Sequence, residues 1–518
     1  MRSTFHTLET AKRSLFTQQA AINTVGHNIA NANTRGYTRQ VVSMTAARPI
    51  EAYGISRTTI PGQLGTGVEF TDIRRIRMGF LDDQYRNQNK LLGTYEIQAD
   101  TLDKLEAIIN EPSDAGIRTV LAQFWNAWSD LSKDPENVTG RKIVRESALA
   151  LVDAFNTISR QLDDLTADLT RNIEVKATEI NTILSTIASL NTEIRRIEGL
   201  GDKANDLRDQ RDLLVDDLSR IVNVSVIESE TGYTISIGGI TIVDGSTATP
   251  VTSEMLLDAY QSGDLDSGEV HGMIVSRDVY VAEYRRQLDS LANTLATGEI
   301  QVIIPAGSYL PQAFASAQTP PLPVPLANDT VVTVRGINGL HQLGYTLEGG
   351  TPPATGLPFF TTSDGSAVFT AGNLRLNPAI ESDVNKIATS MRLDAGGAVV
   401  RGNNSLALLM SELKEIRFTF DETLSGNGVT SAKLSDYYSA LVGEIGVVAN
   451  RMQRNMMNTK MQLDQIESNR QSVSGVSLDE EMSELIRFQH AYNAAARLMT
   501  SFDEILNKLI NGTGVVGR

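Results

Sequence analysis

The sequence has no cysteine among its 518 residues. This absence excludes disulfide bonds, thiol nucleophiles and zinc sites built from thiolates. Aromatic residues make up only 6% of the chain, so large aromatic cores are scarce and the packing of aliphatic helices is expected to dominate. Apolar residues reach 41%, which is enough for real cores, and the length fits two to four domains.

The sequence also has few positive charges relative to negative ones, and it has no long apolar run. The chain has 46 Lys and Arg against 62 Asp and Glu, a net charge of −16, and it has no basic stripe. A nucleic-acid partner is therefore not expected. No apolar run approaches the roughly 20 residues of a membrane span, and Met1–Leu8 lacks the apolar core of a cleaved secretory signal. We expect no membrane span and no cleaved signal peptide.

Patterns that carry catalytic or cofactor chemistry are missing. The five histidines lie too far apart in sequence for a metal-ligand pair at helical spacing, and neither a phosphate-binding GxxxxGK[ST] loop nor a GxSxG elbow occurs. Adjacent carboxylates such as Asp216 and Asp217 are expected on a solvated helix face. The sequence predicts no catalytic residue, no metal site and no cofactor, and the chain is not expected to be an enzyme.

The N-terminal residues carry a heptad pattern. Leu8, Leu15, Ile22 and Ile29 are spaced seven residues apart, which predicts a helix with one apolar seam. The pattern stops before Gly36, where the left-handed backbone that closes a helix is available.

The C-terminal residues predict one helix from Ser477 to Asn511. Ser477 and Glu480 have the spacing of a capping box, and Gly512 supplies the stop. Apolar residues form two neighbouring stripes, one of Leu478, Met482, Leu485, Tyr492, Ala496, Met499 and Leu506, and one of Phe488, Ala495, Leu498, Phe502, Ile505 and Leu509. Together they are wider than a two-stranded coiled coil needs. An ordinary amphipathic helix on a globular core is the alternative, but we expect the two terminal seams to cover each other.

Between the ends, long helices alternate with short β patterns. Glycine and proline punctuate a linker over 40–77, and helical patterns cover 79–110, the residues around Trp125, 138–198, 207–221, 277–297 and 437–470. The helix over 138–198 would span about 90 Å, which fits a rod. Alternating residues predict a hairpin of 222–226 with 233–237.

A change of composition marks an insertion. Between Glu299 and Arg335 the only charged residue is Asp329, and six prolines occur. Strands are expected at 302–304 and 331–334, and with 359–376 they would build a small β-rich domain. The predicted fold is mainly α with a smaller β part, elongated and multi-domain. Its parts are a terminal coiled-coil assembly domain of 1–40 and 472–518, a helical bundle with a β-hairpin of 41–298 and 378–471, and an inserted outer domain of 299–377.

Two terminal motifs resemble a known family. The motif Asn28-Ile29-Ala30-Asn31-Ala32-Asn33-Thr34-Arg35-Gly36-Tyr37, together with Ser474–Met482 running into Gln489–Arg497, is similar to the end signatures of the axial proteins of the bacterial flagellum, which comprise rod, hook and hook-associated proteins. The interior resembles the hook-filament junction members through 205–212, 339–345 and 358–360.

This resemblance implies a structural function, in which subunits form a ring that joins the hook to the filament. It implies as partners the hook protein, the next junction protein, other copies of the chain, and the flagellar type III export machinery with its chaperone. The location would be extracellular, in the flagellum. Another axial component, of hook or rod type, is the alternative within the class, and a secreted adhesin or hydrolase acting through the β insertion is the alternative outside it.

Assembly residues follow from the seams and the resemblance. Asn28, Asn31 and Gly36 also fit an ordinary helix end and turn, but the resemblance makes them the place where neighbouring subunits meet. The predicted assembly residues are Leu8, Leu15, Ile22, Asn28, Ile29, Asn31, Gly36, Tyr37, Leu478, Leu485, Tyr492, Leu498, Met499, Phe502, Leu506 and Leu509.

Overall fold

The computed structural model describes residues 5–49, 65–114, 116–229, 231–311, 324–348, 350, 352–420 and 430–512. Long helices dominate, and the strands form two two-stranded and two four-stranded sheets in this part of the chain. The predicted class, mainly α with a smaller β part, is confirmed. The chain divides into unit 1, which comprises Met1–Thr94, Glu174–His271 and Met456–Arg518, and unit 2, which comprises Tyr95–Ile173 and Gly272–Asn455. The three-domain division stays a prediction.

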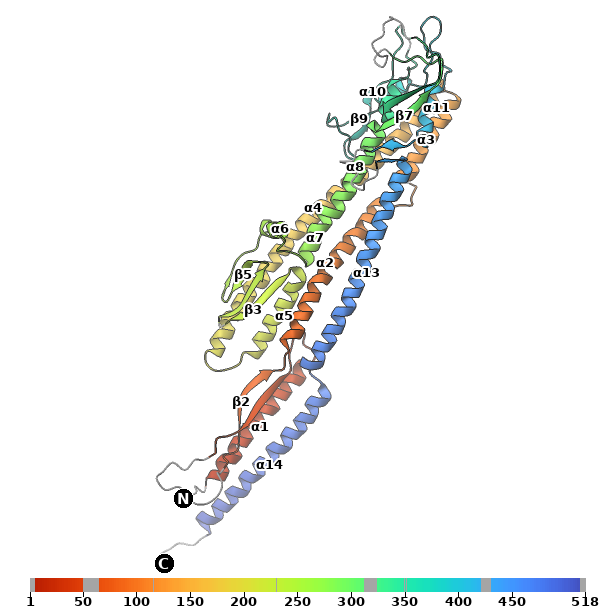
Figure 1. Ribbon diagram of the computed structural model, residues 1–518. Helices are drawn as coiled ribbons and strands as arrows, with labels where there is room; N and C mark the ends of the chain where they lie inside the picture. Colours follow the sequence, from red (N-terminus) through yellow and green to blue (C-terminus); the bar gives the residue numbers. More distant parts are fainter. Residues whose placement is uncertain are drawn as a thin grey trace, which may run out of the picture. The chain divides into compact units, whose positions relative to one another are not determined.

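The terminal helices pair within unit 1. Helix α1 (His6–Asn31) packs along α14 (Leu478–Asn511), as expected from the two seams (Figure 1). The predicted linker also contributes, because strands β1 (Gln40–Ala46) and β2 (Val68–Arg75) form an antiparallel pair with a bulge between Ser43 and Met44, and both strands contact α1. The linker glycines and prolines from Gly54 to Gly62 lie outside the described residues.

The rest of unit 1 combines helices with a four-stranded sheet. Parts of α2 (Gly79–Ile109), α4 (Val138–Glu198) and α13 (Leu434–Ser474) belong to it, and α4 is one continuous helix of 61 residues as predicted. The predicted hairpin is present, and two further strands extend it to the order β3-β4-β5-β6. The remaining elements of this region are α5 (Asn205–Ile221), β3 (Val224–Ser229), β4 (Gly232–Ile237), β5 (Ile240–Asp244), β6 (Thr247–Ala248), α6 (Ser253–Ser262) and α7 (Glu269–Val275).

Unit 2 contains the remaining parts of α2, α4 and α13 and a second four-stranded sheet of order β12-β11-β7-β8. Strands β11 and β12 come from beyond residue 377, so the sheet is completed by residues outside the predicted insertion. Residues 312–323 of that insertion are outside the described part of the chain. The elements of this unit are α3 (Ile117–Lys133), a π-helix (Ser276–Val281), α8 (Ala282–Thr297), β7 (Glu299–Ile304), β8 (Thr330–Arg335), α9 (Gly336–Gln342), β9 (Phe360–Thr362), β10 (Leu374–Leu376), α10 (Pro378–Ser382), a 3-10 helix (Val384–Lys386), α11 (Ser405–Glu412), β11 (Phe418–Thr419) and β12 (Ser431–Ala432).

An aromatic cluster forms part of the core of unit 2 despite the low aromatic content. Phe359 is fully buried, and its ring lies 5.9 Å from Phe124, 5.7 Å from Trp128 and 5.3 Å from His341, measured between ring centroids. The interior motifs at 339–345 and 358–360 thus meet in one place, where they serve packing.

The His341 side chain is held in the neutral form within this core. Its Nδ1–H donates to the carbonyl of Leu357 at 2.5 Å, and its Nε2 accepts from the backbone N–H of Ala388 at 2.9 Å. A neutral imidazole satisfies both contacts, whereas a charged imidazolium would face a donor. Burial lowers the pKa of His341 to about 4.

This arrangement predicts acid sensitivity of unit 2. Because the folded pKa lies below the ordinary value of 6.5, the stabilisation is fully present above pH 6.5 and is lost as the pH falls toward about 4. The loss amounts to about 3 kcal/mol over that window. Denaturant unfolding followed by circular dichroism at several pH values would measure it. His341→Gln should be less stable at pH 7 but should lack this part of the acid slope, and an unchanged slope would contradict the assignment.

Candidate assembly site

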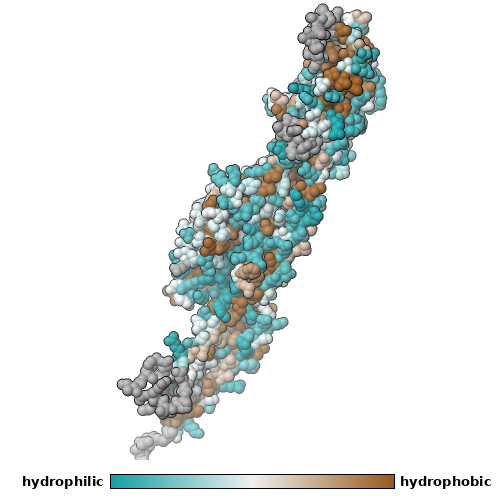
Figure 2. All heavy atoms as spheres, viewed as in Figure 1, coloured by the Kyte–Doolittle hydropathy of each residue, from teal (hydrophilic) through white to brown (hydrophobic). Residues whose placement is uncertain are grey.

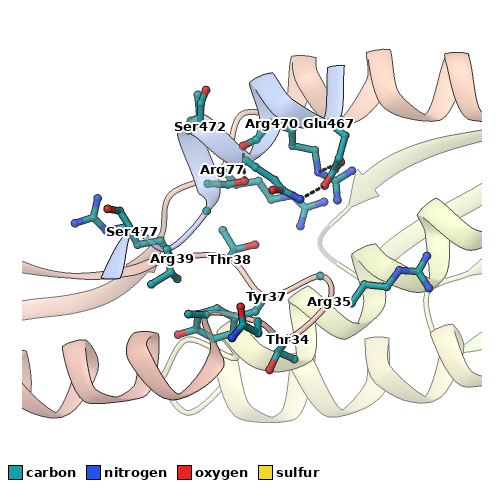
Figure 3. A pocket seen from close by; sticks show the side chains of 18 of the residues that line it. Thr34, Arg35, Tyr37, Thr38, Arg39, Arg77, Glu467, Arg470, Ser472 and Ser477 are labelled. Carbon is teal, nitrogen blue, oxygen red and sulfur yellow. Dashed lines mark hydrogen bonds and ion pairs between the residues drawn. The ribbon is translucent and has the colours of Figure 1, made fainter. Parts of the chain in front are cut away.

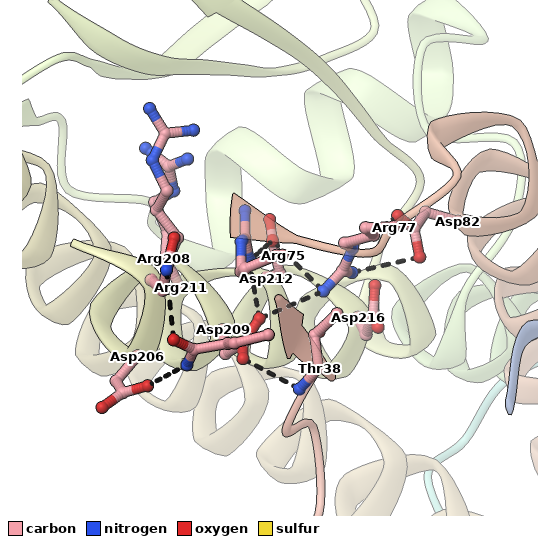
Figure 4. Close-up of polar contacts among 12 residues, drawn as sticks. Thr38, Arg75, Arg77, Asp82, Asp206, Arg208, Asp209, Arg211, Asp212 and Asp216 are labelled. Atoms are coloured by element: carbon pink, nitrogen blue, oxygen red, sulfur yellow. Dashed lines mark hydrogen bonds and ion pairs between the residues drawn. The ribbon is translucent and has the colours of Figure 1, made fainter. Parts of the chain in front are cut away.

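Four arginines and four aspartates form a buried cluster where the terminal segments meet the rest of unit 1. The carboxylates of Asp209, Asp212 and Asp216 lie on one face of α5 because their spacing is three and four residues. They meet the guanidinium groups of Arg75, at the end of β2, and Arg77, just beyond it (Figure 4). Arg86 on α2 and Arg470 near the end of α13 complete the set. We call this the arginine-aspartate cluster, and its members are Arg75, Arg77, Asp82, Arg86, Asp209, Asp212, Asp216 and Arg470.

Each of these side chains is at most 14% exposed, and the charges balance. One Arg75 nitrogen lies 2.6 Å from Asp209 and 2.9 Å from Asp212, and Arg77 lies 3.2 Å from Asp212. Asp216 contacts Arg86 and Arg470, each at 2.8 Å. The expectation that Asp216 lies on a solvated face is therefore wrong, because arginines from distant parts of the chain cover it.

The pKa values of Asp209 and Asp212 on α5 shift in opposite directions. Burial disfavours the charged form of Asp212, but Arg77 and Arg75 outweigh it and hold the pKa of that carboxyl below its ordinary value. At Asp209 burial outweighs the contact with Arg75 and raises the pKa. The hydroxyl of Tyr233 also donates to Asp212 at 2.5 Å. Asp212 is thus the best-satisfied anion of the cluster.

A second set of contacts joins the two terminal motifs to each other. The buried Asn28 side chain donates to Glu481 at 2.9 Å and accepts from the Tyr37 hydroxyl at 2.7 Å. Arg39 donates to Glu481 at 2.7 Å and to Glu480 at 2.8 Å. The N-terminal and C-terminal motifs therefore form one polar site within a single chain.

Glu480 does not act as a capping residue. Ser477 is the N-cap of α14, but its side chain makes no capping hydrogen bond, and Glu480 reaches Arg39 instead. The predicted capping box is therefore wrong, because an arginine from the other end of the chain competes for the carboxylate. Glu481 lies in the C-terminal motif but was not among the predicted assembly residues, and it carries the central contacts.

The turn after α1 sits against α5. Gly36 has φ +81°, and a Cβ at this position would lie 3.1 Å from Leu213. The expected left-handed backbone is therefore present, although α1 already ends at Asn31. The backbone N–H of Thr38 donates to Asp209 at 2.9 Å, which connects this turn to the arginine-aspartate cluster.

An open cleft of about 590 Å³ runs between this turn and the α13–α14 connection (Figure 3). Its walls are residues 32–39 and 471–477, with Arg77, Glu467, Arg470 and Glu480. One backbone contact crosses between the walls, from Arg39 N–H to the carbonyl of Ser474 at 2.9 Å. Both terminal motifs thus line the same surface depression.

The heptad residues of α1 are not its most buried residues. The residues of α1 that are fully buried are mainly small or polar: Ala11, Thr17, Ala21, Thr24, Val25 and Asn28. Among the predicted assembly residues only Asn28 is buried. Those half-buried are Leu8, Leu15, Ile22, Ile29, Asn31, Gly36, Tyr37, Leu485, Tyr492, Met499, Phe502 and Leu506, and those exposed are Leu478, Leu498 and Leu509.

Large apolar side chains remain on the surface of the terminal helices. On α14 these are Leu478, Met482, Ile486, Leu498, Ile505, Leu509 and Ile510, and on α1 Phe16 is also exposed. Figure 2 shows such apolar atoms among polar ones on the visible face of this region. The pairing of the two helices leaves this surface uncovered, as the width of the two α14 stripes suggested.

The described residues contain neither a candidate membrane span nor a candidate metal centre. None of the helices there combines the length and apolar character that crossing a membrane requires. Within the same residues no group of three or more His, Asp or Glu side chains is placed to hold a metal ion.

The chain matches three family models. The flagellar hook-associated protein FlgK helical domain covers residues 102–298, the flagella basal body rod protein model covers 8–38, and the C-terminal model of the flagellar basal body rod FlgEFG proteins covers 467–512. Flagellar hook-associated protein 1 of Bacillus subtilis (strain 168) is 34% identical over 527 residues, with 100% of both chains covered. The chain belongs to the flagellar hook-associated protein 1 family.

Other members of this family are more distant. Flagellar hook-associated protein 1 of Escherichia coli (strain K12) is 26% identical, covering 97% of this chain and 99% of that protein. The structure of the flagellar hook junction protein FlgK from Burkholderia pseudomallei matches with a TM-score of 0.52 at 15% identity, covering 76% of this chain and 100% of the other. That likeness shows the fold alone. As a member of the hook-associated protein 1 family, the chain is a structural component of the bacterial flagellum.

Proposed function

We propose that the chain is the subunit of a ring that joins the flagellar hook to the filament. The observation that carries this proposal is the uncovered apolar surface of the paired terminal helices, which remains after α1 and α14 have packed together. Apolar surface of this kind on a soluble chain is typical of protein interfaces. Neighbouring copies in a ring would cover it. The name of the relatives, flagellar hook-associated protein 1, supports the same role.

The polar contacts around Asn28 and Glu481 support a separate assembly role for the two terminal segments. The contacts of Asn28, Arg39 and Glu481 join the two terminal motifs to each other. The backbone N–H of Thr38 links the N-terminal motif to Asp209, and the arginine-aspartate cluster joins β2, α2, α5 and α13. Burial of balanced, hydrogen-bonded charges sets one orientation rather than maximal stability. We infer that residues 1–40 and 472–518 act as the assembly domain, with the predicted seam residues placed at or beside the interface.

The proposed partners follow from this role. They are the hook protein on one side, the next hook-associated protein on the other, further copies of the chain, and the export machinery with its chaperone before assembly. The location is extracellular, on the flagellum. A rod or hook subunit is the second candidate because the rod-type models match both ends, but the helical-domain match over 102–298 favours the hook-associated class.

Deletion of the gene tests the proposal directly. Cells without the protein are expected to build hooks that carry no filament, and to release flagellin into the medium, because the filament has no surface to start from. Electron microscopy of the cells and immunoblotting of the medium would measure both effects. Re-expression of the full chain is the control. Filaments of normal number and length on the deletion strain would contradict the proposal.

A further inference from the structure

The second strand of the β7–β8 pair lies at the edge of its sheet. In the order β12-β11-β7-β8, strand β8 has β7 as its only strand neighbour among the described residues. Its register against β7 runs without a bulge from Glu299 opposite Arg335 to Ile304 opposite Thr330. One side of a regular six-residue strand therefore presents backbone N–H and C=O groups that no described strand pairs with.

The composition of β8 favours strand addition. Residues 330–334 read Thr-Val-Val-Thr-Val, all β-branched and without charge, glycine or proline. Natural edge strands are usually protected by charges, proline, bulges or short length. The other described edges carry such protection: β3 contains Glu228, β1 has its bulge, and β2 contains charged residues. Strands β9 and β10 have three residues each, and β6 and β12 have two each. Strand β8 has none of these between its ends.

An exposed apolar pair lies beside this edge. Ile303 on β7 and Val331 on β8 face each other in the register, and each is 61% exposed. On the opposite face Ile300, Val302, Ile304 and Val334 are buried in the core. The outer face of the sheet thus carries an apolar patch that a further strand on the β8 edge would partly cover.

We propose that β8 pairs with β8 of a second copy of this chain, antiparallel and about a two-fold axis at Val332. This register places Val332 opposite itself and Val331 opposite Thr333. It keeps the buried faces of both sheets on the same side, because facing residues have the same position in the strand alternation. The result is one continuous eight-stranded sheet from two chains.

Charge complementarity identifies the second copy as the occupant. The two charged residues that flank the strand, Asp329 and Arg335, are six positions apart and of opposite sign. In the proposed register each Asp329 lies opposite the Arg335 of the other chain, once at each end. Both side chains are exposed, and Asp329 is oriented by accepting a hydrogen bond from the N–H of Ala306 at 2.8 Å. The ends of the strand are therefore self-complementary.

This pairing is independent of the junction proposal. A two-fold contact uses the same patch on both copies, whereas neighbouring subunits of a cyclic ring with more than two members contact each other through different patches. The dimer is therefore a state of the chain outside the ring.

Cysteine cross-linking tests the register. The chain has no cysteine, so one introduced thiol can form a disulfide only between copies. In Val332→Cys the two thiols face each other across the axis, with Cα atoms about 4.5–5.5 Å apart. In Val331→Cys the two thiols are offset by two residues along the strands and exceed the reach of a disulfide. On mild oxidation, the full chain with Val332→Cys is expected to give at least about 10-fold more disulfide dimer than the full chain with Val331→Cys. Equal yields from the two variants would overturn the register.

Exchanging the charges of Asp329 and Arg335 tests whether a second copy of the chain is the partner of β8. In sedimentation velocity of the full chain, Asp329→Arg and Arg335→Asp are each expected to weaken dimerisation about 10-fold, because like charges then face each other. The double variant with both changes should return to within about threefold of the original chain. Gln301→Lys is the matched control, since Gln301 lies on the same outer face but on the interior strand β7, and it should leave dimerisation unchanged. Failure of the double variant to recover, or a dissociation constant of the original chain above about 1 mM, would overturn the proposal.

Discussion

Replacing Leu498 and Ile505 together with aspartate is expected to abolish incorporation into the flagellum while changing the unfolding of the free chain little. The two side chains are 46% and 52% exposed, and their seven-residue spacing places them on one face of α14. In the free chain a surface substitution of this kind changes stability by about 0.5 kcal/mol or less. In an assembled interface each change removes about 1.5–3 kcal/mol of apolar burial and adds the cost of desolvating a charge. Subunit association should therefore weaken by more than about 100-fold.

The measurement is complementation of the deletion strain, with filaments counted by electron microscopy and exported protein quantified in the medium. Asn493→Asp with Thr500→Asp is the matched control, because it adds two charges at the same spacing at exposed polar positions of the same helix. It should assemble. Ala495→Asp gives the opposite contrast, since Ala495 is buried and the change should separate α1 from α14 in the free chain. Filaments of normal number with the Leu498 and Ile505 double variant would show that this face is not an interface.

Asp212→Asn is expected to destabilise unit 1 by about 3–5 kcal/mol, the usual cost of removing one partner from a buried charge cluster. The change leaves Arg75 and Arg77 without the anion that both contact, and it alters the acceptor of the Tyr233 hydroxyl. The released charge is buried, so solvent cannot compensate for it. Hydrogen exchange of the amides in α5 and β2 would detect the loss as faster exchange.

The same residue sets a pH dependence with a defined sign. Since the folded pKa of Asp212 lies below its ordinary value of 3.8, its stabilisation is present above that value and is lost as the pH falls through the folded pKa. Asp217→Asn is the control, because Asp217 is 38% exposed and pairs with the exposed Arg35, so its removal should cost less than about 1 kcal/mol. Equal effects of the two substitutions would contradict the importance of the cluster.

Local patterns in the sequence were sufficient to predict the long helices and strands β3, β4, β7 and β8. The 61-residue helix α4 follows from an uninterrupted helical pattern bounded by Asp134-Pro135 and Gly199, and the β3–β4 hairpin follows from two alternating runs around a short turn. These features depend on backbone conformations that neighbouring residues control. The completion of the second sheet by β11 and β12 could not be predicted in this way, because strands of two residues carry no periodic signal.

The candidate assembly site was predictable only in outline. The heptads at both ends indicated that α1 and α14 pair, but the count of large apolar residues selected Leu8, Leu15, Ile22 and Ile29, whereas Ala21 and Val25 are fully buried. Small residues allow α14 and the β1–β2 pair to approach α1 closely. A count of large hydrophobic residues does not detect that requirement. The spacing of Asp209, Asp212 and Asp216 was the available signal for the cluster, yet the same spacing also fits a solvated face.

The sequence by itself determined the family, the helical character and the pairing of the two ends, because these depend on motifs and periodicities that are local or that recur at both termini. Only the tertiary structure decided which charges are buried, which carboxylates pair with Arg39, and which apolar side chains remain exposed. The reason is that burial and ion pairing are properties of two surfaces in contact. Arg470 and Asp216 lie more than 250 positions apart in the chain, and neither residue's neighbours indicate that the two side chains meet at 2.8 Å.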